Sequence, residues 1–381
     1  MPSIQVEPIW VTDNDGLKQY CLQWSELDAV ALDTEFIRTD TFYPLPGLIQ
    51  LGTGSEVYLI DPLIIDQWQP FAQLLENETV VKVLHACSED LEVFKRLTGT
   101  TPKALFDTQI AAAYANIAFS LGYQALIKQL LGVDVPKDET RSDWRQRPLT
   151  DAQVRYASLD VVHLLEVYQT LKNTLTDKPH LQWLLEDCDA MTHNVLSSDV
   201  ENAWKEVKRA WQLRPQQLSI LKALCIYREQ ESRRIDVPRN RVIAKGSLWA
   251  LARYQPDNMR SLSAIQDMKS PVLKNHGNQL LDIIKSSAKT PASMHPKILP
   301  PPLPKDARAH GKRIKELIIK QAKAINVPVE LLLSGKITTP ILRTWLDNGQ
   351  FSLPAVMNGW RREVIGKPLI EQLNQSLNDV A

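Results

Sequence analysis

The sequence is poor in cysteine and has no long apolar run. Its 381 residues contain four cysteines, which lie far apart and form no Cys-x-x-Cys pair. This spacing argues against a zinc site and a disulfide framework, and it favours a reducing, cytoplasmic location. No stretch of about 18 apolar residues could cross a membrane, and the N-terminus does not read as a signal peptide. A GxxxxGK nucleotide-binding motif is also missing, so nothing indicates an ATP-driven enzyme or a nucleotide cofactor.

The charge of the chain is balanced overall but unevenly distributed. Residues 1–204 carry 14 Lys and Arg against 30 Asp and Glu, a net of −16. Residues 205–290 carry 17 against 7, a net of +10, and residues 291–381 carry 13 against 7, a net of +6. The basic rear predicts a polyanionic partner, and nucleic acid is the usual one. The alternative is that the two parts neutralise each other across an interface.

The front of the chain has the pattern of an α/β domain. Short apolar runs punctuated by Gly, Pro and Asp predict four strands, the first three as an antiparallel meander: Val30–Ile37, Leu48–Gly52, Val57–Ile60 and Val80–His85. Amphipathic segments predict five helices: Trp68–Asn77, Ser88–Leu97, Asp107–Ala118, Gly122–Leu131 and Asp151–Leu175. Ser88 is expected to be an N-cap, and Thr150 with Gln153 has the pattern of a capping box.

The rear of the chain is predicted to be helical throughout. Leu218, Leu221, Leu224 and Cys225 recur at helical spacing, as do Leu248, Leu251 and Ala252. Residues 291–306 are rich in proline and indicate a semi-rigid linker, after which a second helical block begins. We therefore expect four segments: 1–204, 205–290, 291–306 and 307–381.

Two carboxylates stand together in the first predicted strand. Asp33 and Glu35 are two residues apart, so their side chains project from the same face of the strand. Like charges near a core are costly, and a divalent cation such as magnesium or manganese would neutralise them. The alternative is an edge strand with both acids in water.

Two further acids occur in helical contexts. Asp90 falls in the first turn of a predicted helix, where it could also be a helix-dipole acid. Asp160 follows Tyr156 by four residues, so the two share one helix face beside an apolar stripe. An Asp in such a position needs a partner unless it is solvated.

In order and spacing these residues resemble the DEDD family of 3′–5′ exonucleases, in its tyrosine-bearing branch, and within it the ribonuclease D family. The resemblance is carried by five segments: Asp33-Thr-Glu-Phe36, Leu48-Ile-Gln-Leu51, His85-Ala-Cys-Ser-Glu-Asp-Leu91, Asp143-Trp-Arg-Gln-Arg-Pro-Leu149 and Tyr156-Ala-Ser-Leu-Asp160. It implies a ribonuclease H-like fold for roughly the first 200 residues. No departure occurs at the five key positions: Asp33, Glu35, Asp90, Tyr156 and Asp160.

The rear half resembles two copies of the HRDC domain, a helical module shared by helicases and the ribonuclease D family. Residues 213–284 carry Tyr227-Arg-Glu and Val237-Pro238 where that module has them. Residues 307–378 resemble a more diverged copy, with Asn358-Gly-Trp-Arg-Arg362 as its clearest piece. The resemblance thus covers nearly the whole chain.

The family resemblance also implies roles for the acids. Asp33 would bridge two divalent ions, Glu35 and Asp160 would complete the site of the ion that activates water, and Asp90 would hold the second ion through water. Tyr156 would orient the attacking water, because a phenol of pKa about 10 is a poor base at neutral pH. The implied reaction releases nucleoside 5′-monophosphates from RNA 3′ ends, with transfer RNA precursors as the family's substrate.

Basic residues of the first helical domain are candidates for RNA binding: Arg228, Arg233, Arg234, Arg239, Arg241 and Lys245. The alternative is a solvated helix face. Gln50 and Arg147 could line a substrate groove or be structural. We expect a monomer. A DNA exonuclease with the same site, and an RNA-binding protein without catalysis, stay open as alternative functions.

Overall fold

Contacts divide the chain into two compact units, each with its own cluster of buried hydrophobic side chains. The computed structural model describes residues 7–136, 142–196, 200–332, 335–355 and 357–378. The larger unit comprises Met1–Ile37, Pro46–Leu196 and Leu303–Ala381. The smaller unit comprises Arg38–Leu45 and Ser197–Pro302.

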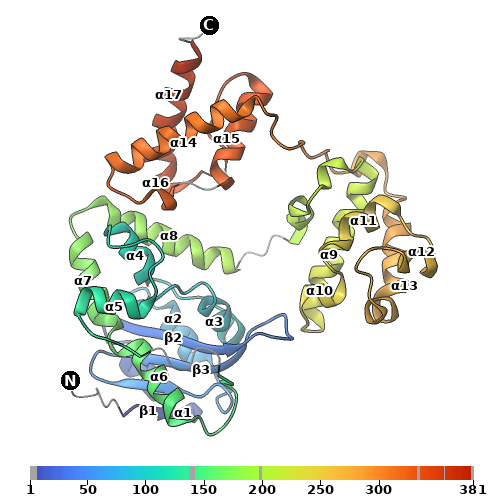
Figure 1. The fold of residues 1–381 in the computed structure, drawn as a ribbon. Coiled ribbons are helices and arrows are strands. Elements are labelled where there is room, and N and C mark those ends of the chain that lie inside the picture. The colour runs from blue at the N-terminus through green and yellow to red at the C-terminus, as the bar shows by residue number, and fades with distance from the viewer. Residues whose placement is uncertain (1–6, 137–141, 197–199, 333–334, 356, 379–381) are drawn as a thin grey trace. The chain divides into compact units, whose positions relative to one another are not determined.

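The larger unit is built on a mixed sheet with the strand order β1-β4-β3-β2-β5-β6 (Figure 1). Its strands are β1 Ile9–Val11, β2 Ala29–Ile37, β3 Leu45–Gly52, β4 Val57–Ile60, β5 Val81–Leu84 and β6 Leu105–Asp107. β4 is antiparallel to β3 and parallel to β1, while β5 is parallel to both β2 and β6. The four predicted strands are confirmed, and β2 lies inside the sheet between β3 and β5.

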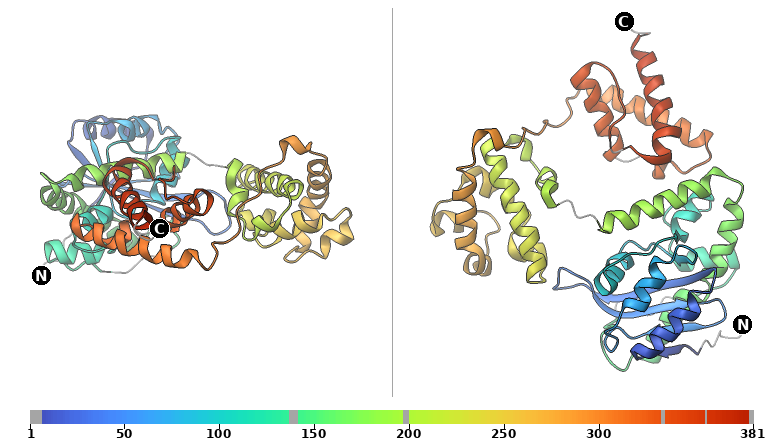
Figure 2. Two further views of the ribbon diagram at one scale, coloured as in Figure 1. Left: turned by 90° about the horizontal axis from the view of Figure 1, so that it is seen from above. Right: turned by 180° about the vertical axis from the view of Figure 1, so that it is seen from behind.

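Helices cover both faces of this sheet. They are α1 Asn14–Trp24, α2 Gln69–Glu76, α3 Asp90–Thr98, α4 Thr108–Tyr114, α5 Tyr123–Leu131, α6 Asp151–Val162, α7 Leu164–Leu175 and α8 Pro179–Leu196. α6, green in Figure 1, crosses one face, and α1 and α2, blue in the rear view of Figure 2, cover the other.

Three sequence expectations for these elements were incomplete or wrong. The segment Asp151–Leu175, predicted as one helix, is two helices that meet at His163. The first, α6, contacts β2 and β4, whereas the second, α7, contacts β2 and β5. Ser88 is not an N-cap, because α3 begins at Asp90 with Glu89 in the capping position and no side-chain cap bond. β1, α1, β6 and α8 were not predicted. The capping box of Thr150 and Gln153 is confirmed.

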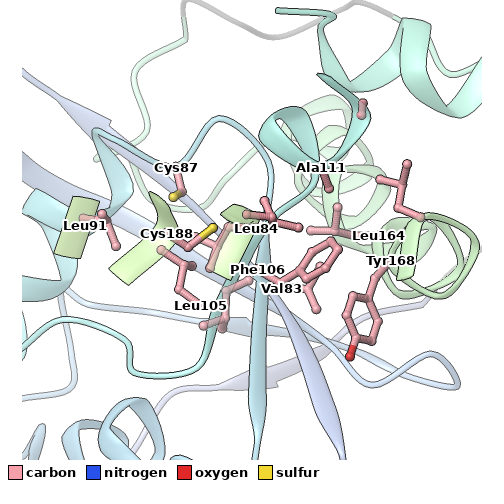
Figure 3. Packing of buried hydrophobic residues seen from close by; sticks show 14 of the residues in the cluster. Val83, Leu84, Cys87, Leu91, Leu105, Phe106, Ala111, Leu164, Tyr168 and Cys188 are labelled. Carbon is pink, nitrogen blue, oxygen red and sulfur yellow. The ribbon is translucent and has the colours of Figure 1, made fainter. Parts of the chain in front are cut away.

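Part of the core of the larger unit lies between β5, β6 and helices α7 and α8 (Figure 3). Val83 and Leu84 of β5 are fully buried there. Phe106 of β6 meets Tyr168 of α7 edge to face, with ring centroids 4.8 Å apart. This packing buries β5 and β6 beneath the helices.

The last helical block belongs to the larger unit. It contains α14 Ala307–Ala324, the 3-10 turn Val329–Leu331, α15 Gly335–Asn348, α16 Gly359–Arg361, the π-helical turn Arg362–Gly366 and α17 Lys367–Asn378. Trp360 stacks on Trp183 of α8 with centroids 4.5 Å apart, and Arg361 forms an ion pair with Asp187. The last helical block is therefore packed onto α8 through its Gly359-Trp-Arg361 motif.

The smaller unit has a separate helical core. Its helices are α9 Pro215–Arg234, α10 Arg239–Val242, α11 Ser247–Tyr254, α12 Met259–Ser263 and α13 Ser270–Ser287, with 3-10 turns at Val200–Glu206, Ala210–Gln212 and Ala292–Met294. The apolar positions predicted from helical spacing, including Leu218, Leu221 and Leu251, are buried in it. Across the described residues, the helices of both units are too short or too polar to span a membrane.

Candidate active site

Asp33 and Glu35 project from the interior of the sheet. β2 lies between β3 and β5, so the alternative of a solvated edge strand is wrong. Because side chains alternate along a strand, both carboxylates leave the same face. Their neighbours Ala31 and Leu32 are fully buried, so the two acids stand at the border of the hydrophobic core.

Asp160 joins this pair from α6. One carboxylate oxygen from each of Asp33, Glu35 and Asp160 lies within 4.8 Å of the other two. The helix that brings Asp160 there begins at the capping box of Thr150 and contacts β2 and β4. Residues far apart in the chain thus place three hard oxygen ligands around one point.

Tyr156 lies one helical turn before Asp160. Its hydroxyl hydrogen-bonds to the Asp160 carboxylate, and its ring lies 5.9 Å from that of Trp144 between centroids. Burial, followed by repulsion from Asp160 and Glu35, raises the pKa of Tyr156 above its ordinary value. The hydroxyl therefore keeps its proton at neutral pH and acts as a hydrogen-bond donor.

Asp90 stands next to the three acids rather than among them. It is the first residue of α3 and is buried. Its carboxylate accepts a hydrogen bond from the Thr34 hydroxyl, and Thr34 separates Asp33 from Glu35 in β2. The sequence analysis did not single out Thr34, although a polar residue within an apolar strand was a visible signal.

Burial disfavours the charged forms of all four carboxylates. It raises the pKa of Glu35 to about 9, with repulsion from Asp160 and Asp90 adding to the effect. It also raises the pKa of Asp160 to about 7 and that of Asp90 to about 6. The pKa of Asp33 is raised well above its ordinary value by burial and by the three other acids.

This donor set fits a divalent metal ion. Carboxylate oxygens are the ligands that magnesium and manganese prefer, and a cation would offset the repulsion that raises the pKa values. Asp33, Glu35 and Asp160 could bind an ion directly. Asp90, held by Thr34, is a further carboxylate beside them.

Tyr123 is a further aromatic residue beside these acids that the sequence analysis missed. Its hydroxyl donates to the Leu159 carbonyl at 3.1 Å. Burial, then repulsion from Asp160 and Asp33, raises its pKa well above the ordinary value. Tyr123 begins α5 and follows a glycine, a context that predicts a helix start but gives no sign of proximity to the acids.

The two predicted groove residues have different surroundings. Arg147 is paired with Asp61 through two contacts of 2.6 Å, and it also donates to the Gly47 carbonyl at 2.8 Å. Gln50 is fully buried, and its amide oxygen and nitrogen have no hydrogen-bond partner within the described part of the chain. Gln50 and Gly52 are two residues apart and lie on the same face of β3. A Cβ added at Gly52 would lie 3.4 Å from the Cβ of Ala31, and Ala31 is on the same face of β2 as Asp33. Gln50 is therefore on the sheet face of Asp33.

The six predicted RNA-binding cations lie in the smaller unit, and five of them have partners inside it. Glu229 accepts from Arg233 at 2.7 Å and from Arg239 at 2.8 Å. Further bonds join Arg234 to Glu231 at 2.8 Å, Arg228 to the Ile243 carbonyl at 2.7 Å, and Arg241 to Asp40. Lys245 is exposed.

Two of these basic residues, Arg233 and Arg239, contact the segment Arg38–Leu45, which follows β2. The guanidinium carbons of Arg233 and Arg239 lie 4.9 and 4.5 Å from the centroid of the Phe42 ring. The backbone N–H groups of Phe42 and Tyr43 both donate to Asp236 at 3.0 Å. Basic residues that the charge pattern predicted to bind RNA are thus used here for packing.

Three family models match successive parts of the chain. A 3′-5′ exonuclease model matches residues 8–176, an HRDC domain model matches residues 217–284, and a model for the C-terminal HRDC domain of ribonuclease D matches residues 307–369.

Relatives of similar length match almost the whole chain. A ribonuclease D of Pseudomonas paraeruginosa is 46% identical over 98% of this chain and 99% of its own. A ribonuclease D of Escherichia coli K12 is 35% identical over 96% of this chain and 98% of its own. The crystal structure of Escherichia coli RNase D, described as an exoribonuclease involved in structured RNA processing, superposes with a TM-score of 0.89 at 34% identity, covering 97% of this chain and 99% of that one.

Proposed function

Because the chain belongs to the ribonuclease D family and is a 3′–5′ exoribonuclease of RNA processing, we propose that five residues form its active site: Asp33, Glu35, Asp90, Tyr156 and Asp160. The observation that carries this proposal is the convergence of Asp33, Glu35 and Asp160 to within 4.8 Å. Convergent, half-buried carboxylates with raised pKa values are typical of a catalytic site rather than of a structural one.

The carboxylates would hold two divalent ions, magnesium or manganese. Asp33 would contact both, Glu35 and Asp160 would complete the site of one, and Asp90 would hold the other through water. When bound, such ions supply an activated water and neutralise charge on the phosphate and the leaving oxygen. The products would be nucleoside 5′-monophosphates.

Tyr156 would position the attacking water. Its hydroxyl is protonated at neutral pH and already hydrogen-bonds to Asp160, so it donates rather than removes a proton. Thr34 is a positioning residue, because its hydroxyl bond restrains the Asp90 carboxylate. Gln50, buried without a partner on the face of Asp33, remains a candidate groove residue, whereas the contacts of Arg147 support a structural role.

Transfer RNA precursors are the proposed substrate. The Escherichia coli relative is described as an exoribonuclease involved in structured RNA processing. The exposed members of the basic cluster, Arg234, Arg239, Arg241 and Lys245, support contact with phosphates. The same site could act on DNA, since a 2′-hydroxyl contact is what would separate the two substrates. We further propose that the protein is a monomer. We also propose a reducing compartment, with which the four free cysteines agree.

The test is a cleavage time course on a transfer RNA precursor labelled at its 5′ end. It should be run with magnesium, with manganese and with chelator, beside the Asp33→Asn variant and a matched DNA strand. A ladder that shortens from the 3′ end and is lost with chelator and in the variant would support the proposed site.

Other outcomes separate the alternatives. Cleavage that persists in Asp33→Asn would mean that the site is misplaced. Equal cleavage of DNA would support a nuclease without sugar discrimination. Tight RNA binding without cleavage under either metal would leave a binding protein as the function.

A further inference from the structure

The junction between α6 and α7 departs from helical hydrogen bonding. α6 ends at Val162 and α7 begins at Leu164, with His163 between them. In a continuous helix the His163 N–H would donate to the Leu159 carbonyl, four residues earlier. Here it donates to the Val161 carbonyl instead. The Leu159 carbonyl therefore needs another donor, because a backbone acceptor inside a domain is costly to leave unpaired.

The side chain of Tyr123, the first residue of α5, supplies that donor. Its hydroxyl donates to the Leu159 carbonyl at 3.1 Å and also accepts from the backbone N–H of His163. The hydroxyl thus stands between the two groups that a continuous helix would join directly. A side chain inserted into the backbone hydrogen-bond ladder is a known cause of a break in a helix. This contact explains why the chain forms two helices here and not one.

The ring of Tyr123 is supported from another element by His85, which follows β5. The centroids of the two rings lie 5.6 Å apart. One ring nitrogen of His85 hydrogen-bonds with the Thr108 hydroxyl at 2.9 Å, and the other with the Leu121 carbonyl at 3.1 Å. Leu121 comes two residues before Tyr123, so the same imidazole contacts the ring and the chain that leads into it. The place of the Tyr123 hydroxyl is therefore set by contacts outside α6.

The last turn of α6 also lies close to the sheet. A Cβ added to Gly52 of β3 would lie 2.9 Å from the carbonyl oxygen of Val161 and 3.3 Å from its Cβ. Glycine in a strand permits such a close approach of another backbone. The turn that contains Asp160 is thus held on one side by Gly52 and on another by the Tyr123 hydroxyl.

We propose that Tyr123 is a positioning residue, which sets the place of the Asp160 carboxylate for metal binding. Asp160 directly follows Leu159, and the carbonyl that accepts from Tyr123 belongs to the peptide group that joins these two residues. Groups that orient metal ligands from outside the coordination shell affect metal affinity about 10- to 100-fold. The proposal rests on the proposed function, because it takes Asp160 as a metal ligand, and it gives a role to a residue outside the five.

The test is a calorimetric titration of manganese alone into the full-length chain, without RNA. Tyr123→Phe removes one oxygen atom and should weaken the affinity for manganese about 10-fold. The Leu159 carbonyl and the His163 N–H could then pair directly, which would draw Asp160 away from Asp33. Gly52→Ala should also weaken the affinity, because its Cβ would push the same turn away from the sheet.

Tyr114→Phe is the matched control. It removes a buried hydroxyl that donates to Asp187 at 2.6 Å, where α4 contacts α8. Both Tyr→Phe variants lose a hydroxyl hydrogen bond, so in chelator both should melt slightly below the parent. The control should change the affinity for manganese by less than about 2-fold. An unchanged affinity in Tyr123→Phe, or an equal loss in the control, would overturn the proposal.

Asp160→Asn distinguishes failure of this proposal from failure of the proposed function. If the parent does not bind manganese, or if Asp160→Asn binds it as tightly as the parent, the proposed metal site fails and this proposal fails with it. If Asp160→Asn loses affinity and Tyr123→Phe does not, the Tyr123 proposal alone fails. RNA cleavage gives a second readout, since a rise in manganese concentration should restore the rate of Tyr123→Phe towards that of the parent but should not restore Asp160→Asn.

Discussion

The pKa values of acids in the two units are shifted in opposite directions. In the larger unit, burial and mutual repulsion raise the pKa values of Asp33, Glu35 and Asp160. In the smaller unit, burial opposes ionisation of Glu229, but hydrogen bonds from Arg239 and Arg233 outweigh it and lower its pKa. Glu229 thus has its cations within the chain, whereas the pKa values of the first group are raised by burial and by other acids, so this group calls for a cation from outside.

The difference separates a structural acid from the acids of the proposed active site. Glu229 brings Arg233 and Arg239 against the Phe42 ring, which fixes the segment after β2. Asp33, Glu35 and Asp160 are held at a cost to the metal-free fold, which is typical of a site selected for chemistry. The predictions below test this contrast.

The largest expected effect is on catalysis. Asp160→Asn should lower RNA cleavage at least about 1000-fold, because it removes a proposed ligand of the ion that would activate water. The matched change Asp151→Asn, at an exposed position of the same helix, should alter the rate by less than about 3-fold. Initial rates with saturating manganese measure both. Comparable losses in the two variants would contradict the assignment of Asp160.

Glu229→Gln should act on stability instead. Removing the charge leaves Arg233 and Arg239 without their shared partner, which should cost about 2 to 4 kcal/mol in the unfolding of the smaller unit. Cleavage of a dinucleotide should stay within about 2-fold of the parent. Chemical denaturation followed by tryptophan fluorescence measures the first quantity. An unchanged midpoint would show that this ion-pair cluster is not structural.

Asp33→Asn should stabilise the metal-free protein, by about 1 to 3 kcal/mol at pH 8, because it removes one of the repelling charges. Manganese should raise the melting temperature of the parent and have little effect on the variant. Differential scanning calorimetry with and without metal measures both. A variant less stable than the parent in chelator would show that the acids do not repel each other in the fold.

The smallest effect is on the pH dependence of stability. The site acids have folded-state pKa values of about 6 for Asp90, about 7 for Asp160 and about 9 for Glu35, above their unfolded values near 4. The folded state therefore binds more protons, and metal-free stability should fall as pH rises from about 5 to 9.

Glu229 has a lowered pKa, so its contribution has the opposite sign and is lost as pH falls below about 4. Melting temperatures in chelator across this range measure both trends. The decline towards pH 9 should be smaller in Asp33→Asn. A stability that rises between pH 6 and 9 would contradict the raised pKa values.

Local patterns predicted much of the fold because they depend on short-range physics. β4 was predicted residue for residue, and β2, β3, β5, α2 and α5 to within a few residues, since each has a clear apolar period bounded by Gly, Pro or Asp. β1 and β6 are three residues long and are stabilised by pairing with β4 and β5, so no local period marks them.

The sequence by itself determined the five candidate active-site residues, the helical rear and the family resemblance, because spacing along a strand or a helix decides which side chains share a face. Only the tertiary structure decided that β2 is an interior strand, that Thr34 restrains Asp90 and that Glu229 draws in the basic residues of α9 and α10. A local pattern shows that a residue is charged. Which charge lies against it depends on contacts between segments distant in the chain, and these form only when the chain folds.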